Sequence, residues 1–537
     1  MNNPLYPGFL PVTRREMDAM GIEQFDFVYV TGDSYVDHPS FGVAIIGRVI
    51  EKLGFTVGII SQPDWRSTKD FTVYGRPKYA FLVTGGCIDS MVNHYTAAKK
   101  RRSDDAYTAG GKAGKRPDRA VIVYCNRIRE AYGDVPLVIG GLEASLRRFA
   151  HYDYWSDRVR RSILFDSGAD ICGFGMGETS TEQIVTRLAS GEPVSALTDI
   201  AGTCVVVDEK PADAVECPSF EKVCGSDEAS KKQYADATRI QYGQQDAFVG
   251  KTLVQRHGDK WVKQNPPSLP LDGKDLDDVY DLPFMRAWHP VYDDVGGVPA
   301  IAEVEHSVTH NRGCFGGCNF CAIVFHQGRY VTSRTEDSVV REAEKITHSP
   351  NFKGYIHDVG GPTANFRPPA CNKKSLCTNR RCLAPYPCPA MKPDHTEYLR
   401  ILRRIRELPR VKKVFVRSGI RYDYLIEDKN EEFFEELVKH HISGQLKVAP
   451  EHCSDRVLDC MGKPHFSIYR RFYKRFYELN KKFGMDQYLV PYMISSHPGS
   501  TLEDAIELAL YLKEINYHPE QVQDFYPTPG TVSTCLF

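Results

Sequence analysis

The sequence predicts an α/β protein, with a doubly wound parallel sheet in its N-terminal part and a partial barrel of six strand–helix units after it. Apolar runs alternate with helical patterns from about residue 25 to residue 190, and a second alternation of the same kind begins near residue 300. Many of these runs are rich in Val and Ile and lack polar alternation, which is typical of strands buried on both faces of a parallel sheet.

The first alternation begins with a predicted strand at 25–30 and a predicted helix at 41–55. Further strands are predicted in the runs TVGIIS, YAFLVTGG, RAVIVYC, PLVIGG and ADICGFG. Glycine pairs at 85–86 and 140–141 fall at strand ends, where ligands of open α/β sheets bind. Tight turns are the alternative role for these glycines.

The middle of the chain differs in composition. It holds a polar stretch with helical character, SDEASKKQYADATRIQYGQQDAF, and then the proline-rich segment KQNPPSLPLDGKDL. These features predict a connector or helical insertion between two domains. We therefore expect domains at 1–195 and 301–537, with the connector at 196–300.

The second alternation contains six predicted strands and five helices between them. The strands are EHSVTHN, GYIHDVGG, KKVFVRSG, GQLKVAP, QYLVPYMISS and QVQDFYPTPG. Six units favour a partial barrel over a complete eight-unit one. Active sites of such barrels lie at the carboxyl ends of the strands.

Composition restricts the class of protein. A net charge of -1 gives no general attraction to nucleic acid, so such a partner is possible but not indicated. No apolar run approaches the roughly 20 residues that span a bilayer, and the first residues do not resemble a secretory signal, so we expect a cytoplasmic protein without a membrane partner. Sixteen cysteines in a reducing compartment favour metal binding or catalysis.

Three of these cysteines form a CxxxCxxC triplet directly after the first predicted barrel strand: Cys314, Cys318 and Cys321. Thiolates are soft ligands that select zinc, copper(I) or iron–sulfur clusters. Structural zinc requires four ligands, whereas three cysteines leave one iron of a four-iron cube open. The glycines within this stretch allow the backbone to wrap closely around a cube. The triplet therefore predicts an open [4Fe-4S] cluster; zinc or incidental cysteines are the alternatives.

Seven stretches spread over almost the whole chain resemble the YgiQ family of radical S-adenosylmethionine (SAM) proteins. They are MVNHYTAAKKRRSDDAYTAGGKAGKRPDRA, GGLEASLRRFAHYDYWSD, GCFGGCNFCAI, HDVGGPTAN, FVRSGIRYD, LKVAPEH and QVQDFYPTPGT. The resemblance implies an enzyme that cleaves SAM reductively to a 5′-deoxyadenosyl radical. It also implies an electron donor of the flavodoxin or ferredoxin type, and it does not identify the substrate.

Contacts with SAM follow from the same resemblance. Gly360 and Gly361 end the second barrel strand, where the family has a glycine-rich motif whose backbone receives the methionine amino group, although Pro362 replaces the usual glutamate. The ends of the third and fourth strands supply candidates for carboxylate and ribose contacts, and an aromatic residue inside the triplet could pack on the adenine: Arg417, Ser418, Glu451 and Phe320. A salt bridge, cap or turn is the alternative role for each.

A second group of cysteines lies between the second barrel strand and the next helix, as an insertion at 371–388: Cys371, Cys377, Cys382 and Cys388. Four thiolates can close a zinc site or hold a second iron–sulfur cluster. Their spacing matches neither the zinc knuckle nor a ferredoxin run, so unligated or redox-active cysteines are the alternative.

The N-terminal domain resembles the B12-binding domains that precede the barrel in many radical SAM enzymes. The stretch DSYVDHPSFG is loosely similar to the DxHxxG loop whose histidine ligates cobalt, but the spacing differs. We expect the B12-binding-like fold, leave cobalamin uncertain, and interpret His38 as a loop or active-site histidine. The basic run at 99–102 is interpreted as a solvated face, with phosphate contact as the alternative. The aromatic stretch at 151–155 could line a substrate cleft or pack between domains.

Other classes of protein remain as alternatives. One is a methylthiotransferase-like enzyme that modifies RNA or protein, because Cys87, Cys125 and Cys172 lie at predicted strand ends about 40 residues apart. Another is an iron–sulfur protein for electron transfer or sensing, and a third is a nucleic-acid-binding module that holds zinc at the second cysteine group. The sequence stops soon after the sixth barrel strand, so we expect a piece of a longer protein.

Overall fold

The computed structural model describes residues 2–367, 370–371, 373, 377, 381–519 and 522–537. The chain forms two compact units. The first consists of the residues up to Leu269 together with Val279–Glu305, and the second of Pro270–Asp278 together with His306–Phe537.

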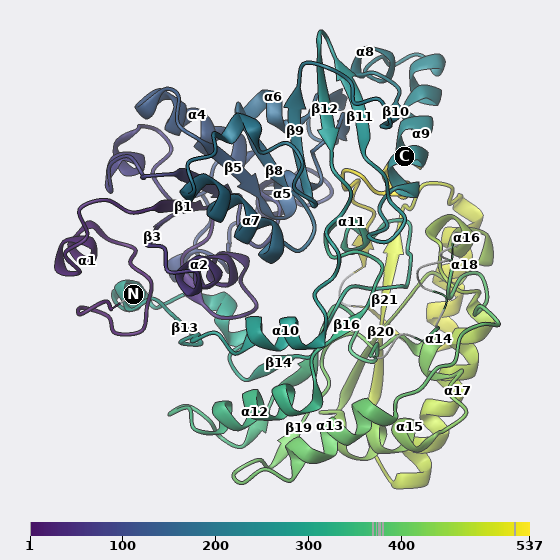
Figure 1. Cartoon of the computed structure of the whole chain (residues 1–537). Coiled ribbons are helices and arrows are strands. Elements are labelled where there is room, and N and C mark those ends of the chain that lie inside the picture. Colours follow the sequence, from purple (N-terminus) through teal and green to yellow (C-terminus); the bar gives the residue numbers. More distant parts are fainter. Residues whose placement is uncertain (1, 368–369, 372, 374–376, 378–380, 520–521) are drawn as a thin grey trace. The chain divides into compact units, whose positions relative to one another are not determined.

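The first unit is built on a nine-stranded sheet (Figure 1) with the order β10-β11-β12-β9-β8-β5-β4-β1-β3. Five strands form its parallel part: β1 (Phe27–Thr31), β3 (Val57–Ser61), β4 (Ala80–Thr84), β5 (Leu137–Gly140) and β8 (Ile171–Gly173). Numbered along the chain, these five have the order 2-1-3-4-5, which is the flavodoxin-like form of the doubly wound fold. The predicted fold class is confirmed for this unit.

The helices of the first unit include one that the sequence analysis assigned wrongly. The run RAVIVYC at 119–125 was predicted as a strand, but it begins the helix α4 (Ala120–Tyr132). Its buried side chains recur at helical spacing, at Ala120, Val121, Tyr124, Cys125 and Ile128. The other helices of this unit are α1 (Arg14–Ala19), α2 (Gly42–Lys52), α3 (Ser90–His94), α5 (Gly141–Ser145), α6 (Ile163–Ser167), α7 (Glu178–Ala189), α8 (Phe220–Val223) and α9 (Glu228–Gly243).

The stretch at 196–300, which was predicted as a connector, contributes four strands to the same sheet. They are β9 (Thr203–Val207), β10 (Val215–Cys217), β11 (Leu253–His257) and β12 (Lys260–Gln264). β9 runs antiparallel to β8 and β12, and β11 and β12 form a hairpin. The polar stretch within it is helical, as predicted, and forms α9. Smaller antiparallel pairs join β2 (Val36–Asp37) to β13 (Ala287–Trp288) and β6 (His151–Asp153) to β7 (Arg158–Arg160).

The second unit contains all six predicted barrel strands, and their pairing is parallel. The first and third are β14 (Ser307–Thr309) and β19 (Lys413–Val414), and the second is divided into β17 (Tyr355–Ile356) and β18 (Asp358–Gly360). The last three are β20 (Gln445–Glu451), β21 (Tyr488–Ser495) and β22 (Gln523–Asp524). A parallel bridge between Ile420 and Val448 connects the third strand to the fourth.

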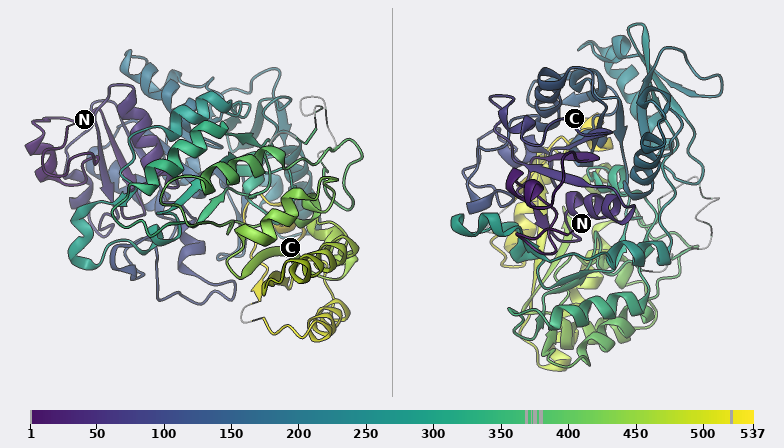
Figure 2. Two further views of the ribbon diagram at one scale, coloured as in Figure 1. Left: turned by 90° about the horizontal axis from the view of Figure 1, so that it is seen from below. Right: turned by 60° about the vertical axis from the view of Figure 1, so that its left-hand side comes forward.

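Helices follow the barrel strands at each predicted position, and they lie outside the strands in the further views of Figure 2. They are α12 (Glu336–Thr347), α13 (Thr396–Arg406), α15 (Glu432–Glu436) continued by the π-turn η6 (Leu437–His441), α17 (Phe466–Phe483) and α18 (Leu502–Glu514). Shorter helices are α10 (Gly273–Tyr280), α11 (Ile323–His326), α14 (Tyr422–Leu425), α16 (Asp455–Met461) and α19 (Val532–Leu536).

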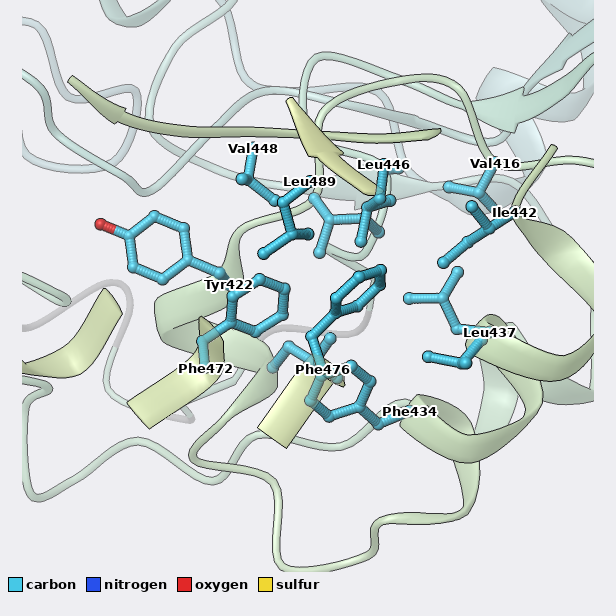
Figure 3. Close-up of a cluster of buried hydrophobic side chains, with 14 of the residues drawn as sticks. Val416, Tyr422, Phe434, Leu437, Ile442, Leu446, Val448, Phe472, Phe476 and Leu489 are labelled. Carbon is cyan, nitrogen blue, oxygen red and sulfur yellow. The ribbon is translucent and has the colours of Figure 1, made fainter. Parts of the chain in front are cut away.

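The core of the second unit lies between these helices and the strands (Figure 3). Phe472 and Phe476 of α17 and Phe434 of α15 face Leu446 of β20 and Leu489 of β21. Phe434 and Phe472 stack with their ring centroids 5.3 Å apart. This apolar layer packs against one face of the strands and holds their carboxyl ends in fixed positions. Within the described residues, no helix combines the length and apolar character needed to cross a membrane.

Candidate functional site

The cysteine triplet lies in a loop that follows the first barrel strand, between the two-residue strands β15 (Asn311–Arg312) and β16 (Thr332–Ser333), which pair antiparallel. Two further bonds close the loop. The backbone N–H of Cys314 donates to the carbonyl of Gly328 at 3.2 Å, and that of Gly313 donates to Gln327 Oε1 at 3.1 Å. The loop is therefore a closed structure at the carboxyl end of a parallel strand, where barrel enzymes place their chemistry.

Three glycines shape the path of this loop. Gly313 has φ +81°, and a Cβ there would lie 1.8 Å from the carbonyl oxygen of Tyr330. Gly317 also has a positive φ, of 67°. At Gly316 a Cβ would lie 2.3 Å from an Arg421 nitrogen and 3.2 Å from Cys314 Sγ. Glycine lets the backbone pass close to the thiols and to this guanidinium.

Other parts of the second unit hold the far end of the loop. The backbone N–H of Asn319 donates to the carbonyl of Met461 at 2.8 Å, and its side-chain amide donates to the carbonyl of Cys460 at 2.9 Å, both at the end of α16. The carbonyl of Asn319 accepts from the backbone N–H of Ser533 in α19 at 2.9 Å. Residues near the end of the chain therefore help to fix the triplet.

The three thiols are close enough to influence one another. Burial raises the pKa of Cys321 to about 12, with smaller contributions from Cys318 and Cys314. Burial also raises the pKa of Cys314, against the opposing effect of the Arg421 cation. Metal binding at these thiols would therefore release protons. The set of donors fits an iron–sulfur cluster, since it offers three soft ligands in a loop that is partly shielded from water.

No group of three or more His, Cys, Asp or Glu side chains in the described residues converges on a single metal ion. A four-iron cube does not require such convergence, because each thiolate binds a different iron atom. The triplet is therefore suited to a cube and not to a structural zinc ion, which needs four ligands about one point.

A buried ion pair that the sequence analysis did not single out lies beside the triplet. Arg421 Nη1 is 3.5 Å from Cys318 Sγ. The rest of its guanidinium donates to Asp423 through Nε at 2.8 Å and through Nη2 at 2.5 Å. Burial acts to raise the pKa of Asp423, but the Arg421 charge outweighs it and the pKa is lowered. The Arg421 guanidinium, held in place by Asp423, puts a positive charge beside the thiols, and this charge acts against the rise in the pKa of Cys314.

The predicted SAM residues at the second and third strand ends lie together. Asp358 Oδ1 accepts from the backbone N–H groups of Arg417 at 2.8 Å and Ser418 at 3.1 Å, and its other oxygen accepts from the Ser418 hydroxyl. Gly360 packs against this group, because a Cβ there would lie 2.2 Å from Ser418 Oγ. At Gly361 a Cβ would lie 1.8 Å from Asn311 Oδ1.

Arg417 is exposed, and Glu451 is buried at the end of β20. Glu451 has φ +70°, a backbone conformation that costs energy for a residue other than glycine and is often found at functional sites. Burial raises the pKa of this carboxyl, and Lys463, at 3.8 Å, and Arg421 act against the rise. Glu451 also raises the pKa of Cys321, so the fourth strand end and the triplet belong to one electrostatic neighbourhood.

His497, after the fifth barrel strand, is a second residue that the sequence analysis did not identify. Its ring meets Phe320 edge-on at 6.3 Å, and its Nε2 is 2.7 Å from Ser533 Oγ. Burial lowers its pKa to about 4, so the imidazole is neutral near pH 7. The signal was available in the sequence, since the run HPGS directly follows a predicted strand. The packing of Phe320 on adenine stays a prediction.

The second cysteine group lies after β18, and its members are only partly buried. The backbone N–H of Cys388 donates to the carbonyl of Cys382 at 2.8 Å, and that of Lys373 lies 3.3 Å from Cys371 Sγ. Cys382 packs against an apolar cluster that also contacts Cys314. Metal binding by Cys371, Cys377, Cys382 and Cys388 stays a prediction.

His38 lies in the turn after β2, as its interpretation as a loop residue predicts. It is 1% exposed, its Nδ1 accepts from the backbone N–H of Ser40 at 3.1 Å, and burial lowers its pKa well below the ordinary value. Protein side chains also fill the space beside the strand-end glycines. A Cβ would lie 2.5 Å from the Glu143 carboxylate at Gly85 and 2.1 Å from Asp33 at Gly86. Protein side chains therefore lie close against both glycines at this edge.

Comparison with known proteins assigns the family. The family model described as Radical SAM N-terminal matches residues 9–307, and the model of the Radical SAM superfamily matches 308–512. A UPF0313 protein of Clostridium botulinum (strain ATCC 19397 / Type A) is 56% identical over 534 residues, which cover 98% of this chain and 82% of the relative. A UPF0313 protein of Clostridium perfringens (strain ATCC 13124) is 55% identical over 535 residues, covering 98% and 80%.

The chain belongs to the UPF0313 family of radical SAM proteins. The resemblance to the YgiQ family is thereby confirmed, and so is the class of enzyme. This UPF0313 protein uses a [4Fe-4S] cluster with an open site to cleave SAM reductively, and it requires a reductant and a substrate.

The fold of this UPF0313 protein is shared with a solved structure of low sequence identity. The radical SAM methyltransferase TsrM from Kitasatospora setae, with cobalamin and a [4Fe-4S] cluster bound, is 15% identical and has a TM-score of 0.52. The match covers 95% of this chain and 77% of TsrM.

Proposed function

We propose that Cys314, Cys318 and Cys321 are the three protein ligands of the [4Fe-4S] cluster. The observation that supports this most is the placement of three mutually interacting thiols in a glycine-shaped loop, directly after the first barrel strand, with the Arg421 cation 3.5 Å from one of them. When bound here, the cluster would deliver one electron to the SAM sulfonium, so that the C–S bond breaks and a 5′-deoxyadenosyl radical forms.

The protein's own residues would bind and orient SAM at the same strand ends. Gly360 and Gly361 bring the backbone of the second strand end close to its neighbours, which suits reception of the methionine amino group. Arg417 is exposed and cationic, so it is suited to the carboxylate, while Ser418 and Glu451 offer oxygen atoms to ribose hydroxyls. Phe320 would pack against the adenine. Asp358 positions the third strand end, because it accepts from the backbone of Arg417 and Ser418.

The electron donor in this proposal is a flavodoxin or ferredoxin, and the compartment is the cytoplasm. Both follow from the redox chemistry. The structure shows no disulfide among the cysteines of the described residues, which is the state that a reducing compartment maintains. One-electron carriers of low potential are abundant there and are suited to reduce a cluster before SAM cleavage.

The cluster assignment is tested by serine substitution of each thiol. After anaerobic reconstitution, the wild-type protein should contain about four irons per chain and form 5′-deoxyadenosine when dithionite and SAM are added. Cys314→Ser, Cys318→Ser and Cys321→Ser should each lose most of the iron and all detectable 5′-deoxyadenosine. Cys224→Ser, at an exposed thiol of the first unit, is the matched control and should retain both.

Retention of the cluster and of SAM cleavage in any triplet variant would overturn the assignment. A variant in which Cys371, Cys377, Cys382 and Cys388 are all serine separates the two cysteine groups. Metal analysis that shows iron or zinc beyond the first cluster in the wild type, and its loss in this variant, would establish a second site. Equal metal content in the wild type and in this variant would rule out a second metal site.

A further inference from the structure

Two segments that lie some 50 residues apart in the sequence pack together on the first unit. One is the loop after α3, which carries the basic run at 99–102, and the other is the turn between β6 and β7. The Tyr154 hydroxyl donates to the carbonyl of Ala97 at 2.6 Å, and the Lys99 ammonium lies 4.4 Å from the centre of the Tyr154 ring. Arg119 donates to Asp153 at 2.7 Å and holds the base of the turn.

The basic loop has a defined backbone. Tyr95 forms an antiparallel bridge with Arg101, and Asp104 forms another with Lys112. The backbone N–H of Arg102 donates to the carbonyl of His94 at 2.7 Å. These bonds place the run at 99–102 and Lys112 on one folded loop, so their charges are presented together and not on a free tail.

The cations of this loop are not neutralised by the protein. Lys99, Lys100, Arg101, Arg102, Lys112 and Lys115 are all exposed, and in the described part of the chain none of them forms an ion pair with a carboxylate. Neighbouring carboxylates bond to other groups: Asp104 to Ser103, Asp118 to His94 and Tyr95, Asp153 to Arg119, and Asp157 to Tyr152. Arg116 of the same loop differs, because it is buried and paired with Asp33 and Asp105.

Two aromatic rings lie beside these charges. Tyr154 and Trp155 are both partly exposed and meet edge-on with their centroids 5.9 Å apart. We name the exposed cations together with these two rings the basic–aromatic patch: Lys99, Lys100, Arg101, Arg102, Lys112, Lys115, Tyr154 and Trp155. The patch is a local feature, since the whole chain has a net charge of only -1.

We propose that the basic–aromatic patch binds single-stranded nucleic acid. Unpaired lysines and arginines attract phosphodiesters and release counterions when they bind. Partly exposed aromatic rings offer a platform on which unpaired bases stack, which a duplex cannot supply because its bases are already stacked. Arg101 and Arg102 can also contact phosphate oxygens with two N–H donors each. RNA and DNA share this chemistry, and the experiment distinguishes them.

The test measures fluorescence anisotropy of labelled 15-residue oligo(U) and oligo(dT), and of a duplex of equal length, with the full chain. Both single strands should bind more tightly than the duplex, and a tighter oligo(U) complex would identify RNA as the source. The logarithm of the affinity should fall linearly with the logarithm of salt concentration, at about -0.7 per phosphate neutralised. Replacing Lys99, Lys100, Arg101 and Arg102 by Gln should weaken binding at least tenfold and reduce the slope by up to about 3.

The stacking part of the proposal has its own variants. Trp155→Ala should weaken single-strand binding about fivefold or more, whereas Trp155→Phe, which keeps an aromatic ring, should restore most of it. The matched charge control replaces Lys222, Lys231, Lys232 and Lys251, four exposed cations elsewhere in the first unit, by Gln and should bind as the wild type does. Circular dichroism establishes that each variant is folded.

Four outcomes would overturn the proposal. These are absence of binding at about 50 mM salt, tighter binding of the duplex, equal losses in the patch variant and the charge control, and no effect of Trp155→Ala while polyphosphate competes as well as oligo(U). The last would show a surface that recognises charge alone. Binding of vesicles with anionic phospholipid by the wild type, without binding of oligonucleotide, would likewise count against nucleic acid and identify a membrane surface.

Discussion

Arg421 joins the chemistry of the site to the stability of the second unit. Its side chain is 10% exposed and that of Asp423 is fully buried, and the two are joined by two hydrogen bonds. A buried charge whose partner is removed remains in a medium of low dielectric without compensation. This pair is therefore both a source of positive charge beside the thiols and a structural requirement.

We predict that Arg421→Ala lowers the free energy of unfolding of the iron-free protein by about 3–5 kcal/mol. The cost is that of leaving the Asp423 carboxylate buried and unpaired. Urea denaturation followed by circular dichroism measures it. Arg421→Ala combined with Asp423→Ala is the control and should recover part of the loss. If the double variant were as unstable as the sum of the single ones, the pairing explanation would fail.

The pKa of Asp153 indicates that the stability of the first unit depends on pH. Burial acts to raise its pKa, but bonds from Ser156 and Arg119 lower it to about 2. Since the folded-state pKa lies below the unfolded one, the stabilisation is complete above the unfolded value and is lost as pH falls through the folded value. The contribution is about 2.5 kcal/mol near pH 7, and about half of it is lost by pH 3.

The measurement compares the wild type with Asp153→Asn by urea denaturation between pH 3 and pH 7. The difference in stability should shrink by about 1 kcal/mol over this interval, because other groups titrate equally in both proteins. Asp208→Asn, at an exposed carboxylate, is the control and should show no comparable change. A constant difference for Asp153→Asn across the interval would contradict the assigned shift.

At the scale of elements, the proposed SAM site lies at the strand ends, and the glycines there differ in their surroundings. A Cβ at Gly360 would lie 2.2 Å from Ser418 Oγ and 2.4 Å from Asp358 Oδ2, whereas nothing lies within 4 Å of a Cβ at Gly419, on the next strand end. The first glycine is therefore required by packing, and the second is not.

We predict that Gly360→Ala lowers the affinity of the reconstituted protein for SAM at least tenfold, because the added methyl group displaces Ser418 and Asp358. Equilibrium dialysis with labelled SAM measures this, and iron content per chain shows whether the cluster is retained. Gly419→Ala should bind SAM within about twofold of the wild type. Equal effects of the two substitutions would show that packing at the second strand end does not shape the SAM pocket.

Hydrophobic pattern predicted most of these elements, and its failures have physical reasons. All six barrel strands and the helices between them were predicted, because their hydrophobic periodicity is visible in the sequence. The run RAVIVYC was misassigned since seven residues are too few to distinguish a buried strand from the first two turns of α4. The strands β9–β12 were missed because their pairing is set by tertiary structure and not by local pattern: β9 pairs with β8 and β12, and β11 pairs with β10 and β12.

Some residues near the candidate site were singled out from the sequence, and others were not. The triplet was singled out as a candidate because its three cysteines are close together in the sequence. Arg421 was not found, because nothing in the local sequence shows that it points toward Cys318, more than 100 residues earlier. The contact between Tyr154 and Ala97 could not be predicted for the same reason, although each of the two segments has a distinctive composition.

At the scale of the whole molecule, the boundary between the units is not a single point in the chain. Pro270–Asp278 belongs to the second unit, although the following residues up to Glu305 belong to the first. Asp277 accepts from the backbone N–H of Thr335 at 3.0 Å and from its hydroxyl at 2.5 Å, at the residue that caps α12. The early segment therefore stabilises a helix of the second unit.

We predict that a fragment beginning at residue 270 melts about 2–8 °C higher than one beginning at residue 306. The two hydrogen bonds to Asp277 contribute about 1–2 kcal/mol, and each kcal/mol shifts the midpoint of a unit of this size by about 2–4 °C. Thermal circular dichroism measures both fragments. Asp277→Ala in the longer fragment is the control and should remove most of the gain; a gain that persists in it would show that these bonds are not the cause.

The interleaving of the two units has a consequence for synthesis on the ribosome. Asp277 emerges 58 residues before the partner that it must meet. At about 5–20 residues per second, this is a wait of roughly 3–12 s. Until Glu305 emerges, about halfway through this interval, the first unit still lacks the end of its closing segment. Synthesis of the second unit therefore begins before the first unit is complete, and codon-dependent pauses between residues 278 and 305 would delay the completion of both.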